Sequence, residues 1–309
     1  MPLYLRARAA NAAGIGGVRG ALTRKLLGLA KVLPPPASTH ASFTPPDGPQ
    51  DVRFAAVDST IVRKLFWFGR AGYEHQTIER WERVASRSNR IVDLGANFGL
   101  YTVYAAAANP EASVLAVEPH PRSFSVLAEN VGLNDASNVQ LIEAAVSERG
   151  GERLELCVPA GDLDEAPGGA FLDAADGGVR RTTLERFEVD TVAAAEVLEG
   201  ADLVKIDVEG QERAILSAAE DVILRDRPVV FLEILGQSED LTALLADWVR
   251  HTDYGLFYVD EAGIGRRVDD ARIATPYLAS SVGALYDNFA LIDERRNTDV
   301  IRDIWQRVR

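Results

Sequence analysis

The feature that most constrains this chain is a short apolar run that breaks into a glycine-containing turn and continues as a second apolar run. It occupies residues 91–101 and reads Ile-Val-Asp-Leu-Gly-Ala-Asn-Phe-Gly-Leu-Tyr. This pattern predicts a buried strand, a turn and a helix, the unit at which α/β proteins bind nucleotides. Gly95 and Gly99 allow backbone angles that other residues avoid, and the start of the helix offers unpaired N–H groups to a ligand.

A second apolar run follows and ends in an acid. Residues 113–117 predict a strand, and Glu118 stands where α/β proteins place a ribose-binding carboxylate. A glycine turn combined with an acid at this position does not distinguish a site for NAD from a site for another adenosine ligand. A dinucleotide fingerprint calls for glycine at position 97, where the backbone approaches a pyrophosphate, so Asn97 favours an adenosine ligand without one.

The rest of the chain alternates predicted strands and helices. Apolar runs such as residues 229–232 suit strands that are buried on both faces, so we expect a doubly wound α/β fold with a largely parallel sheet. The predicted strands are residues 91–94, 113–117, 139–144, 202–207, 229–234, 256–259 and 288–292. A long crossover adds a predicted strand at 153–158 and a flexible Gly-, Ala- and Asp-rich excursion at 161–178. The predicted helices are residues 100–108, 121–132, 211–221 and 241–251.

Length and charge set the expected organisation. With 309 residues and 47% hydrophobic content, the chain can bury one large core. All 46 acidic residues lie after position 46, whereas six of the 33 basic residues lie before it. The acidic remainder disfavours nucleic acid, and the basic arm is either mobile or in weak contact with a membrane or an acidic partner. We divide the chain into a basic arm with a Pro-rich linker (1–50), a cap segment (51–89), a core (90–293) and a C-terminal helix (294–309).

The cysteine content and the hydropathy bear on the compartment. A single cysteine, Cys157, excludes an intramolecular disulfide framework and agrees with a reducing cytosol. No apolar run approaches the roughly 20 residues that cross a bilayer. We therefore expect a soluble, cytoplasmic protein, and the oligomeric state stays open.

Further motifs follow the glycine turn in a fixed order. They are Glu118-Pro119, residues 123–134, Asn138-Val139, residues 144–147 and the run Val-Lys-Ile-Asp-Val-Glu-Gly-Gln-Glu at 204–212. Over residues 70–292 the chain resembles the FkbM family of S-adenosylmethionine-dependent methyltransferases. The resemblance implies a class I methyltransferase fold, with a seven-stranded, mostly parallel, Rossmann-like sheet whose last strand, here 288–292, runs antiparallel, and with an N-terminal helical arm or cap. It also implies O-methylation of a hydroxyl on a natural product, sugar or glycan.

The resemblance also assigns a cofactor site. Ligands of such sheets bind beyond the carboxyl ends of the strands, where the strand order reverses, and here that point lies between the first and fourth strands. Gly95, Asn97 and Gly99 would line the methionine end of S-adenosylmethionine, with Asp93 organising that loop, and Glu118 would hold the ribose hydroxyls. The full set of expected cofactor-binding residues is Glu74, Asp93, Gly95, Asn97, Gly99, Glu118 and Asp207.

Carboxylates gather at the same edge of the predicted sheet. Asp207 ends the fourth strand and Glu233 ends the fifth. Methyl transfer from a sulfonium requires alignment and removal of the hydroxyl proton, so Asp207 is the first candidate for the base, with Glu233 and His75 as further catalytic candidates. Alternatively, Asp207, Glu209 and Glu233 bind a divalent ion that lowers the pKa of the hydroxyl. A competing interpretation is that Glu209 and Glu212 stabilise the start of the following helix.

Three polar residues near these motifs have two interpretations each. His75 follows Glu74 in a segment that family members often place near the cofactor, but it also fits a plain helix face. His120 adjoins Glu118 and either touches the ribose or lies in a surface loop. Lys205 lies in a buried strand, where we expect it to snorkel or to pair with an acid; the competing interpretation is that it acts on the substrate.

Two other functions compete with methyl transfer. One is an NAD-linked oxidoreductase on a similar sheet, which Asn97 and residues 207–212 disfavour. The other is a catalytically silent module that keeps the cofactor pocket. The expected partner is a small-molecule or glycan hydroxyl acceptor. We expect acceptor specificity in the N-terminal cap, the excursion and residues 263–287, and none of these segments carries a readable motif.

Overall fold

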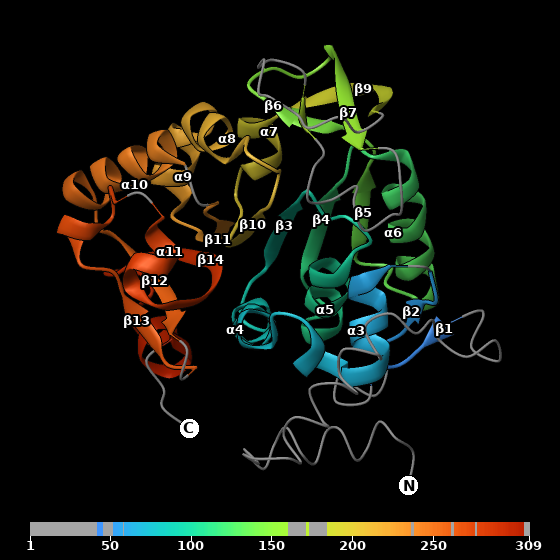
Figure 1. The fold of residues 1–309 in the computed structure, drawn as a ribbon, viewed down its shortest axis with the longest axis horizontal. Coiled ribbons are helices and arrows are strands. Elements are labelled where there is room, and N and C mark those ends of the chain that lie inside the picture. Colours follow the sequence, from blue (N-terminus) through green and yellow to red (C-terminus); the bar gives the residue numbers. More distant parts are fainter. Residues whose placement is uncertain are drawn as a thin grey trace, which may run out of the picture.

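The computed structural model describes residues 42–45, 52–57, 59–159, 171–172, 184–235, 238–260, 263–275 and 277–305 (Figure 1). Most of the predicted basic arm and linker, and all but two residues of the predicted excursion, lie outside this range. In the described part of the chain, no helix is both long and apolar enough to cross a bilayer.

The centre of the molecule is an eight-stranded sheet. Its order is β13 (Gly265–Arg267), β12 (Tyr254–Asp260), β14 (Ala284–Asp293), β11 (Val229–Glu233), β10 (Leu203–Ile206), β3 (Arg90–Leu94), β4 (Ser113–Val117) and β5 (Val139–Ile142). The strands from β11 to β5 pair in parallel, whereas β14 runs antiparallel between β11 and β12. The predicted α/β sheet and its antiparallel last strand are confirmed, and all seven predicted strands of the sheet are present.

The eighth strand was not predicted from the sequence. Strand β13 has three residues, and Arg266 and Arg267 are exposed, so it carries no apolar run. It exists because it pairs antiparallel with β12, with Phe257 opposite Arg267. An edge strand of this kind follows from its neighbour and not from its own sequence.

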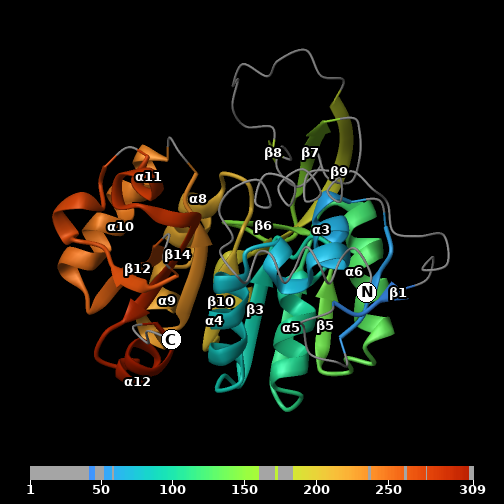
Figure 2. The same ribbon diagram turned by 60° about the horizontal axis from the view of Figure 1, so that its bottom comes forward.

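Helices cover both faces of the sheet, as Figures 1 and 2 show. One face packs against α4 (His75–Ala85) and α5 (Leu100–Ala108), and α6 (Pro121–Leu133) lies beside α5 over β4. The other face packs against α7 (Ala194–Leu198), α8 (Glu212–Ala218), α9 (Glu220–Asp226) and α10 (Glu239–His251). Alternate residues of the central strands enter the two apolar cores, which is the arrangement of a doubly wound sheet.

The helix predicted at 211–221 is two helices in the structure. Helix α8 ends at Ala218 and α9 begins at Glu220, because Ala219 between them leaves the helical conformation at φ −110° and ψ 13°. Both helices contact α7. The sequence has no glycine or proline here, so it gave no signal for this break.

Smaller elements complete the fold. A four-stranded sheet has the order β6 (Ala145–Ser147), β9 (Leu184–Ala193), β7 (Arg153–Pro159) and β8 (Phe171–Leu172), and it includes the strand predicted at 153–158. The cap segment contains β1 (Ser42–Phe43), β2 (Phe54–Ala55), α3 (Thr60–Phe68) and the 3₁₀ turn η2 (Gly69–Gly72). The segment before the last strand contains η3 (Asp270–Arg272) and α11 (Leu278–Val282). Residues 294–309 form less helix than predicted, because only α12 (Thr298–Val300) and η4 (Ile301–Trp305) are helical among the described residues.

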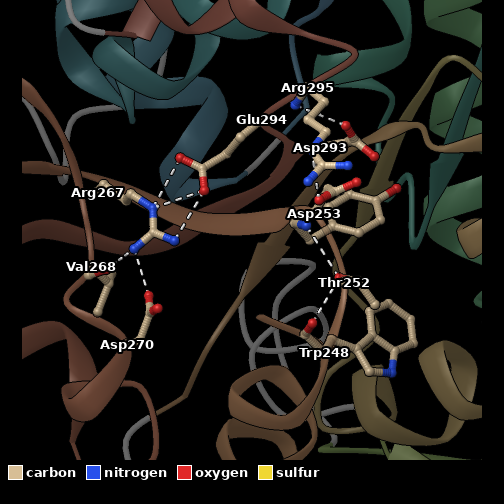
Figure 3. A network of polar contacts seen from close by, with 10 residues as sticks. Trp248, Thr252, Asp253, Arg267, Val268, Asp270, Asp293, Glu294 and Arg295 are labelled. Carbon is tan, nitrogen blue, oxygen red and sulfur yellow. Dashed lines mark hydrogen bonds and ion pairs between the residues drawn. The ribbon is translucent and has the colours of Figure 1, made fainter. Parts of the chain in front are cut away.

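A network of polar contacts surrounds the end of β14 (Figure 3). Because β14 runs antiparallel to β11, this end lies at the amino-terminal edge of the parallel strands, opposite to their carboxyl ends. Arg267 contacts Glu294 at 3.0 Å and also pairs with Asp270, and Arg295 contacts Asp253 at 3.0 Å. Tyr254, beside Asp253, pairs in register with Asp293 of β14. These ion pairs fix the end of β14 that is opposite to the site.

Candidate functional site

The carboxyl edge of the sheet brings polar residues from four strands into one row. Lys205 pairs in register with Asp93 and with Phe231, so Asp207, two residues later, stands level with Gly95 and Glu233. Glu233 in turn pairs with Asn288 of β14. Side chains two residues apart in a strand share a face. We call Gly95, Asp207, Glu233 and Asn288 the rim.

The rim lies on the face of the sheet that α4 and α5 cover. Phe231 points to this face, because its ring meets Trp81 of α4 edge-on with 5.5 Å between centroids. Asp207 is bound to the sheet through its N–H, which donates to the carbonyl oxygen of Leu94 at 3.1 Å. The rim therefore sits where the strand order reverses, between β3 and β10, the point at which such sheets bind ligands.

The predicted turn after β3 is confirmed. Glycine is required at position 95 by the packing of the backbone as well as by the approach of a ligand. Its φ is +73°, and a Cβ atom there would lie 1.8 Å from the backbone oxygen of Asp207. The close passage of β10 thus requires glycine at this position. Gly99 has φ +87°, and its missing Cβ leaves room for Leu127 of α6. Asn97 also adopts a left-handed conformation, at φ 51°.

Glu118 joins two turns of the predicted cofactor site. Its carboxylate accepts the N–H of Asn97 at 2.8 Å and the N–H of His120 at 2.8 Å. The side chain is 6% exposed, and burial raises the pKa of Glu118 to about 7. Each carboxylate oxygen keeps a second lone pair, so Glu118 can still accept ribose hydroxyls.

The buried carboxylate of Asp93 connects two elements next to the glycine turn. Its carboxylate accepts a hydrogen bond from the hydroxyl of Thr102 at 2.6 Å, which ties β3 to the first turns of α5. The side chain is 2% exposed, and burial raises the pKa of Asp93 to about 6. These contacts agree with the expected role of Asp93 in organising the loop.

Lys205 pairs with an acid, as expected. Its Nζ lies 2.6 Å from Oδ2 of Asp207, and only 1% of the lysine is exposed. The ammonium also lies 4.7 Å from the centre of the Tyr101 ring, a cation–π distance. Asp207 is therefore held in position by a buried lysine.

Glu74 lies over the rim and is surrounded by hydrogen-bond donors. Tyr101 of α5 donates its hydroxyl to Glu74 at 2.6 Å, and the side chains of Tyr73 and Asn288 also hydrogen bond to Glu74. Burial raises the pKa of Glu74 above its ordinary value. The backbone of Glu74 is left-handed, at φ 37°.

Three residues of the site, Tyr73, Tyr101 and Asn288, were not predicted from the sequence. Tyr101 stands in the glycine-turn run and Tyr73 precedes Glu74, so both lay beside residues that were considered. Asn288 begins the predicted last strand and had no local signal. Only the pairing of β14 with β11 brings it to the rim.

Acids crowd this edge of the sheet. Burial and the charge of Asp207 raise the pKa of Glu209 to about 8 and that of Glu233 to about 8. The positive charge of Lys205 lowers the pKa of both residues and so offsets part of this rise. Crowded, buried carboxylates favour a ligand that brings positive charge.

Glu212 has a structural role. It is 3% exposed, and its carboxylate accepts the N–H groups of Val208 and Gly210, both at 3.1 Å. Glu212 thus closes the turn that carries Glu209 at φ 53°. This favours the interpretation that Glu212 serves the start of the helix.

The two histidines near the site, His120 and His75, differ in their surroundings. His120 is 4% exposed, and its Nδ1 lies 3.0 Å from the hydroxyl of Ser123 at the start of α6. Its ring also packs edge-on against the ring of Phe187. Because His120 is buried, the surface-loop interpretation was wrong. Burial lowers the pKa of His120. His75 begins α4, and its Nε2 lies 3.0 Å from Nε2 of Gln76. The catalytic role of His75 stays a prediction.

The metal alternative gains no support from geometry. Across the described residues, no group of three or more His, Cys, Asp or Glu side chains is arranged to hold a metal ion. Asp207, Glu209 and Glu233 were the candidate ligands, and they do not form such a group.

A cavity of about 780 Å³ lies beside the turn at Gly210, between the starts of α8 and α10. Its lining residues are Gly210, Glu212, Arg213, Ser238, Glu239, Asp240, Leu241 and Tyr277. Glu212 is the one sequence-predicted polar residue among them. None of the four rim residues lines this cavity.

The strand order and the rim together define a Rossmann-like α/β protein of the class I methyltransferase type. The sequence profile of the Methyltransferase FkbM domain matches residues 93–256, more than half of the chain. The chain therefore belongs to the FkbM family of methyltransferases. The matched region begins at Asp93 in β3 and does not include Glu74 or Asn288.

Individual relatives agree. The chain is 30% identical over 190 residues to a protein named Methyltransferase sdnD from Sordaria araneosa, which covers 51% of this chain and 71% of that protein. It is 27% identical over 150 residues to Methyltransferase 1 from Beauveria bassiana (strain ARSEF 2860), covering 42% of this chain and 58% of that one. The solved structure of methyltransferase FkbM from Methylobacillus flagellatus KT superposes with a TM-score of 0.42 at 16% identity, over 75% of this chain and 54% of that chain. The fold assignment rests on the strand order and not on this superposition.

Proposed function

We propose that this methyltransferase uses S-adenosylmethionine to methylate a hydroxyl oxygen. The observation that carries the proposal is the link between Asn97 and Glu118, which joins the glycine turn to the acid that follows β4. A ribose bound at Glu118 and a methionine chain along the turn would point the methyl group towards β10. Asp207 and Glu233 stand there, level with Gly95.

The charge of the site supports this cofactor over NAD. S-adenosylmethionine brings a sulfonium and an ammonium group to the buried acids. A dinucleotide would instead bring a pyrophosphate, whose negative charges Glu118, Asp207 and Glu209 would repel. The position of Asn97, where a dinucleotide site has glycine, points the same way.

The chemistry requires a base beside the methyl group. The acceptor oxygen attacks the methyl carbon, the carbon–sulfur bond breaks with its electrons passing to sulfur, and the hydroxyl proton goes to a carboxylate. Asp207 is already paired with Lys205, whereas the pKa of Glu233, raised to about 8, suits proton transfer near neutral pH. We assign proton removal to Glu233 and alignment to Asp207, with His75 as the remaining candidate base.

Calorimetry tests the cofactor. Titration of the protein with S-adenosylhomocysteine and, separately, with NAD should give saturable binding for the first ligand only. Binding of NAD alone would overturn the proposal. Methyl transfer from S-adenosylmethionine, measured with and without EDTA, then distinguishes an active enzyme from a silent module and shows whether a divalent ion is required.

The acceptor and the cellular setting are also proposals. We expect a small-molecule or glycan hydroxyl acceptor, no nucleic acid, and a cytoplasmic location. Contact of residues 1–50 with a membrane or an acidic partner concerns a segment that is largely outside the described residues.

A further inference from the structure

Asn288 carries a buried polar atom that has no partner. The residue is 7% exposed, and its side-chain oxygen Oδ1 makes no hydrogen bond in the structure. Buried polar atoms are almost always hydrogen bonded to protein or to ordered water, so a buried atom without a protein partner needs an explanation. No donor among the described residues reaches Oδ1, so this atom can accept a hydrogen bond from water or from a ligand.

The orientation of the Asn288 amide follows from its neighbours. Its nitrogen faces Glu74, whose carboxylate accepts a hydrogen bond from it. The opposite orientation would place the amide oxygen against carboxylate oxygens. The oxygen is thus left free on the rim, beside Glu233, the residue that pairs with Asn288 in register.

In the proposed placement, the hydrogen-bond donors of the cofactor stay at β4 and β3, the ribose hydroxyls at Glu118 and the ammonium along the glycine turn. Neighbouring strands are about 4.8 Å apart, so three steps from β3 to β14 place Asn288 roughly 14 Å from the glycine turn. A ribose held by Glu118 on β4 would extend the cofactor in the opposite direction. This placement puts the methyl group over β10 and leaves the space over β11 and β14 to the methyl acceptor.

We propose that Asn288 binds the acceptor and that the acceptor carries two neighbouring hydroxyl groups, as a sugar does. This inference rests on the proposed function. Directly opposed residues of antiparallel strands hold their Cβ atoms about 5 Å apart, so Glu233 and Asn288 present two hydrogen-bond acceptors side by side. Glu233 takes the proton of the hydroxyl that is methylated, and Oδ1 of Asn288 accepts the O–H of its neighbour.

Methyl transfer to matched substrates tests the inference on the full chain. The probes are methyl glycopyranosides, which carry vicinal hydroxyls, and their monodeoxy counterparts, with radiolabelled S-adenosylmethionine as donor. Wild-type protein should show a value of kcat/KM roughly tenfold higher for a diol than for the deoxy compound that lacks the neighbouring hydroxyl. Asn288→Leu should remove this preference by raising KM for the diol, while the affinity for S-adenosylhomocysteine stays within about twofold.

A matched control separates this role from loss of stability. Asn297 also has a buried side-chain nitrogen without a partner, but it lies beyond the other end of β14. Asn297→Leu should leave the diol preference unchanged. If Asn288→Leu does not fold, Asn288→Gln replaces it, because it keeps the amide but displaces the oxygen.

Each contrary result has a distinct meaning. Loss of affinity for S-adenosylhomocysteine in Asn288→Leu would make Asn288 a cofactor residue and overturn the inference. Equal turnover of diols and deoxy compounds would do the same, as would binding of S-adenosylhomocysteine with no transfer to any glycoside. Absence of S-adenosylhomocysteine binding in the wild type would instead overturn the proposed function itself.

Discussion

At the scale of single residues, the site depends on what neighbouring strands allow. Gly95 is needed because the backbone of Asp207 passes where a side chain would begin, so the turn and the end of β10 are one unit. Asp207 is held by Lys205, and Lys205 in turn lies over Tyr101. A change at one of these residues is expected to affect the others.

Gly95→Ala should destabilise the fold and abolish cofactor binding. The added Cβ would clash with the carbonyl of Asp207 and would also force alanine into a left-handed conformation. We expect a loss of more than about 3 kcal/mol in the free energy of unfolding, measured by urea denaturation. Gly132→Ala is the control, because nothing lies within 4 Å of its Cβ position in α6, and it should stabilise by about 0.5–1 kcal/mol. Wild-type stability of Gly95→Ala would contradict the geometry described above.

Glu233→Gln and Asp207→Asn should both slow turnover, but with different side effects. Loss of the base in Glu233→Gln should lower kcat by roughly 10² to 10⁴ with little change in the affinity for S-adenosylhomocysteine. Asp207→Asn removes the partner of the buried Lys205, so we expect a lower melting temperature as well. Calorimetry, kinetics and thermal melting on both variants check this. If only Asp207→Asn is slow, the base is Asp207.

At the scale of elements, the cap segment is attached to the core through a short hairpin. Strand β1 pairs with β2, and Phe43 meets the ring of Phe66 edge-on at 5.4 Å between centroids. Phe54 of β2 is fully buried. The boundary that we drew at residue 50 therefore falls inside a structural unit, because β1 belongs with the cap.

Two truncations test this boundary. Removal of residues 1–40 should leave the melting temperature and the affinity for S-adenosylhomocysteine unchanged. Removal of residues 1–46 also deletes β1 and the buried side chain of Phe43, so we expect a loss of about 1–3 kcal/mol in stability. Equal stability of the two truncated proteins would show that the hairpin contributes nothing.

At the scale of the whole molecule, the crowded acids make stability depend on pH. The folded protein raises the pKa of Glu118 to about 7 and that of Glu209 and Glu233 to about 8. In the unfolded chain the pKa of a glutamate is about 4.3. At pH values between the unfolded and the folded pKa, the native state therefore binds more protons than the unfolded chain. Stability is therefore greatest below the unfolded pKa and falls as the pH rises through the folded values.

Thermal melting of the ligand-free protein should accordingly show a decreasing melting temperature from about pH 5 to about pH 8. The slope should be shallower in Glu233→Gln, which cannot ionise. S-adenosylmethionine, which is cationic at sulfur, should recover more stability at the upper end of this range than S-adenosylhomocysteine does. A melting temperature that rises with pH would show that these acids are not buried as described.

The sequence by itself determined the elements with strong local signals. Residues 91–101 specify a strand, a glycine turn and a helix because apolar runs and glycines act over a few residues. The same holds for Glu118, which ends a strand, and for Lys205, whose burial required a partner. The sheet, its antiparallel last strand and the family followed from such motifs and their order.

Only the tertiary structure decided which residues meet. Strand β13 and the break at Ala219 have no local signal, because pairing and packing create them. Asn288 reaches Glu233 through a pairing between segments that are far apart in the chain, and no local pattern records such a contact. The role of Gly95 follows from the passage of β10 beside it. The chemistry of the rim depends on how the strands pair in the folded sheet, whereas the tendency of each segment to form a strand depends on its local sequence.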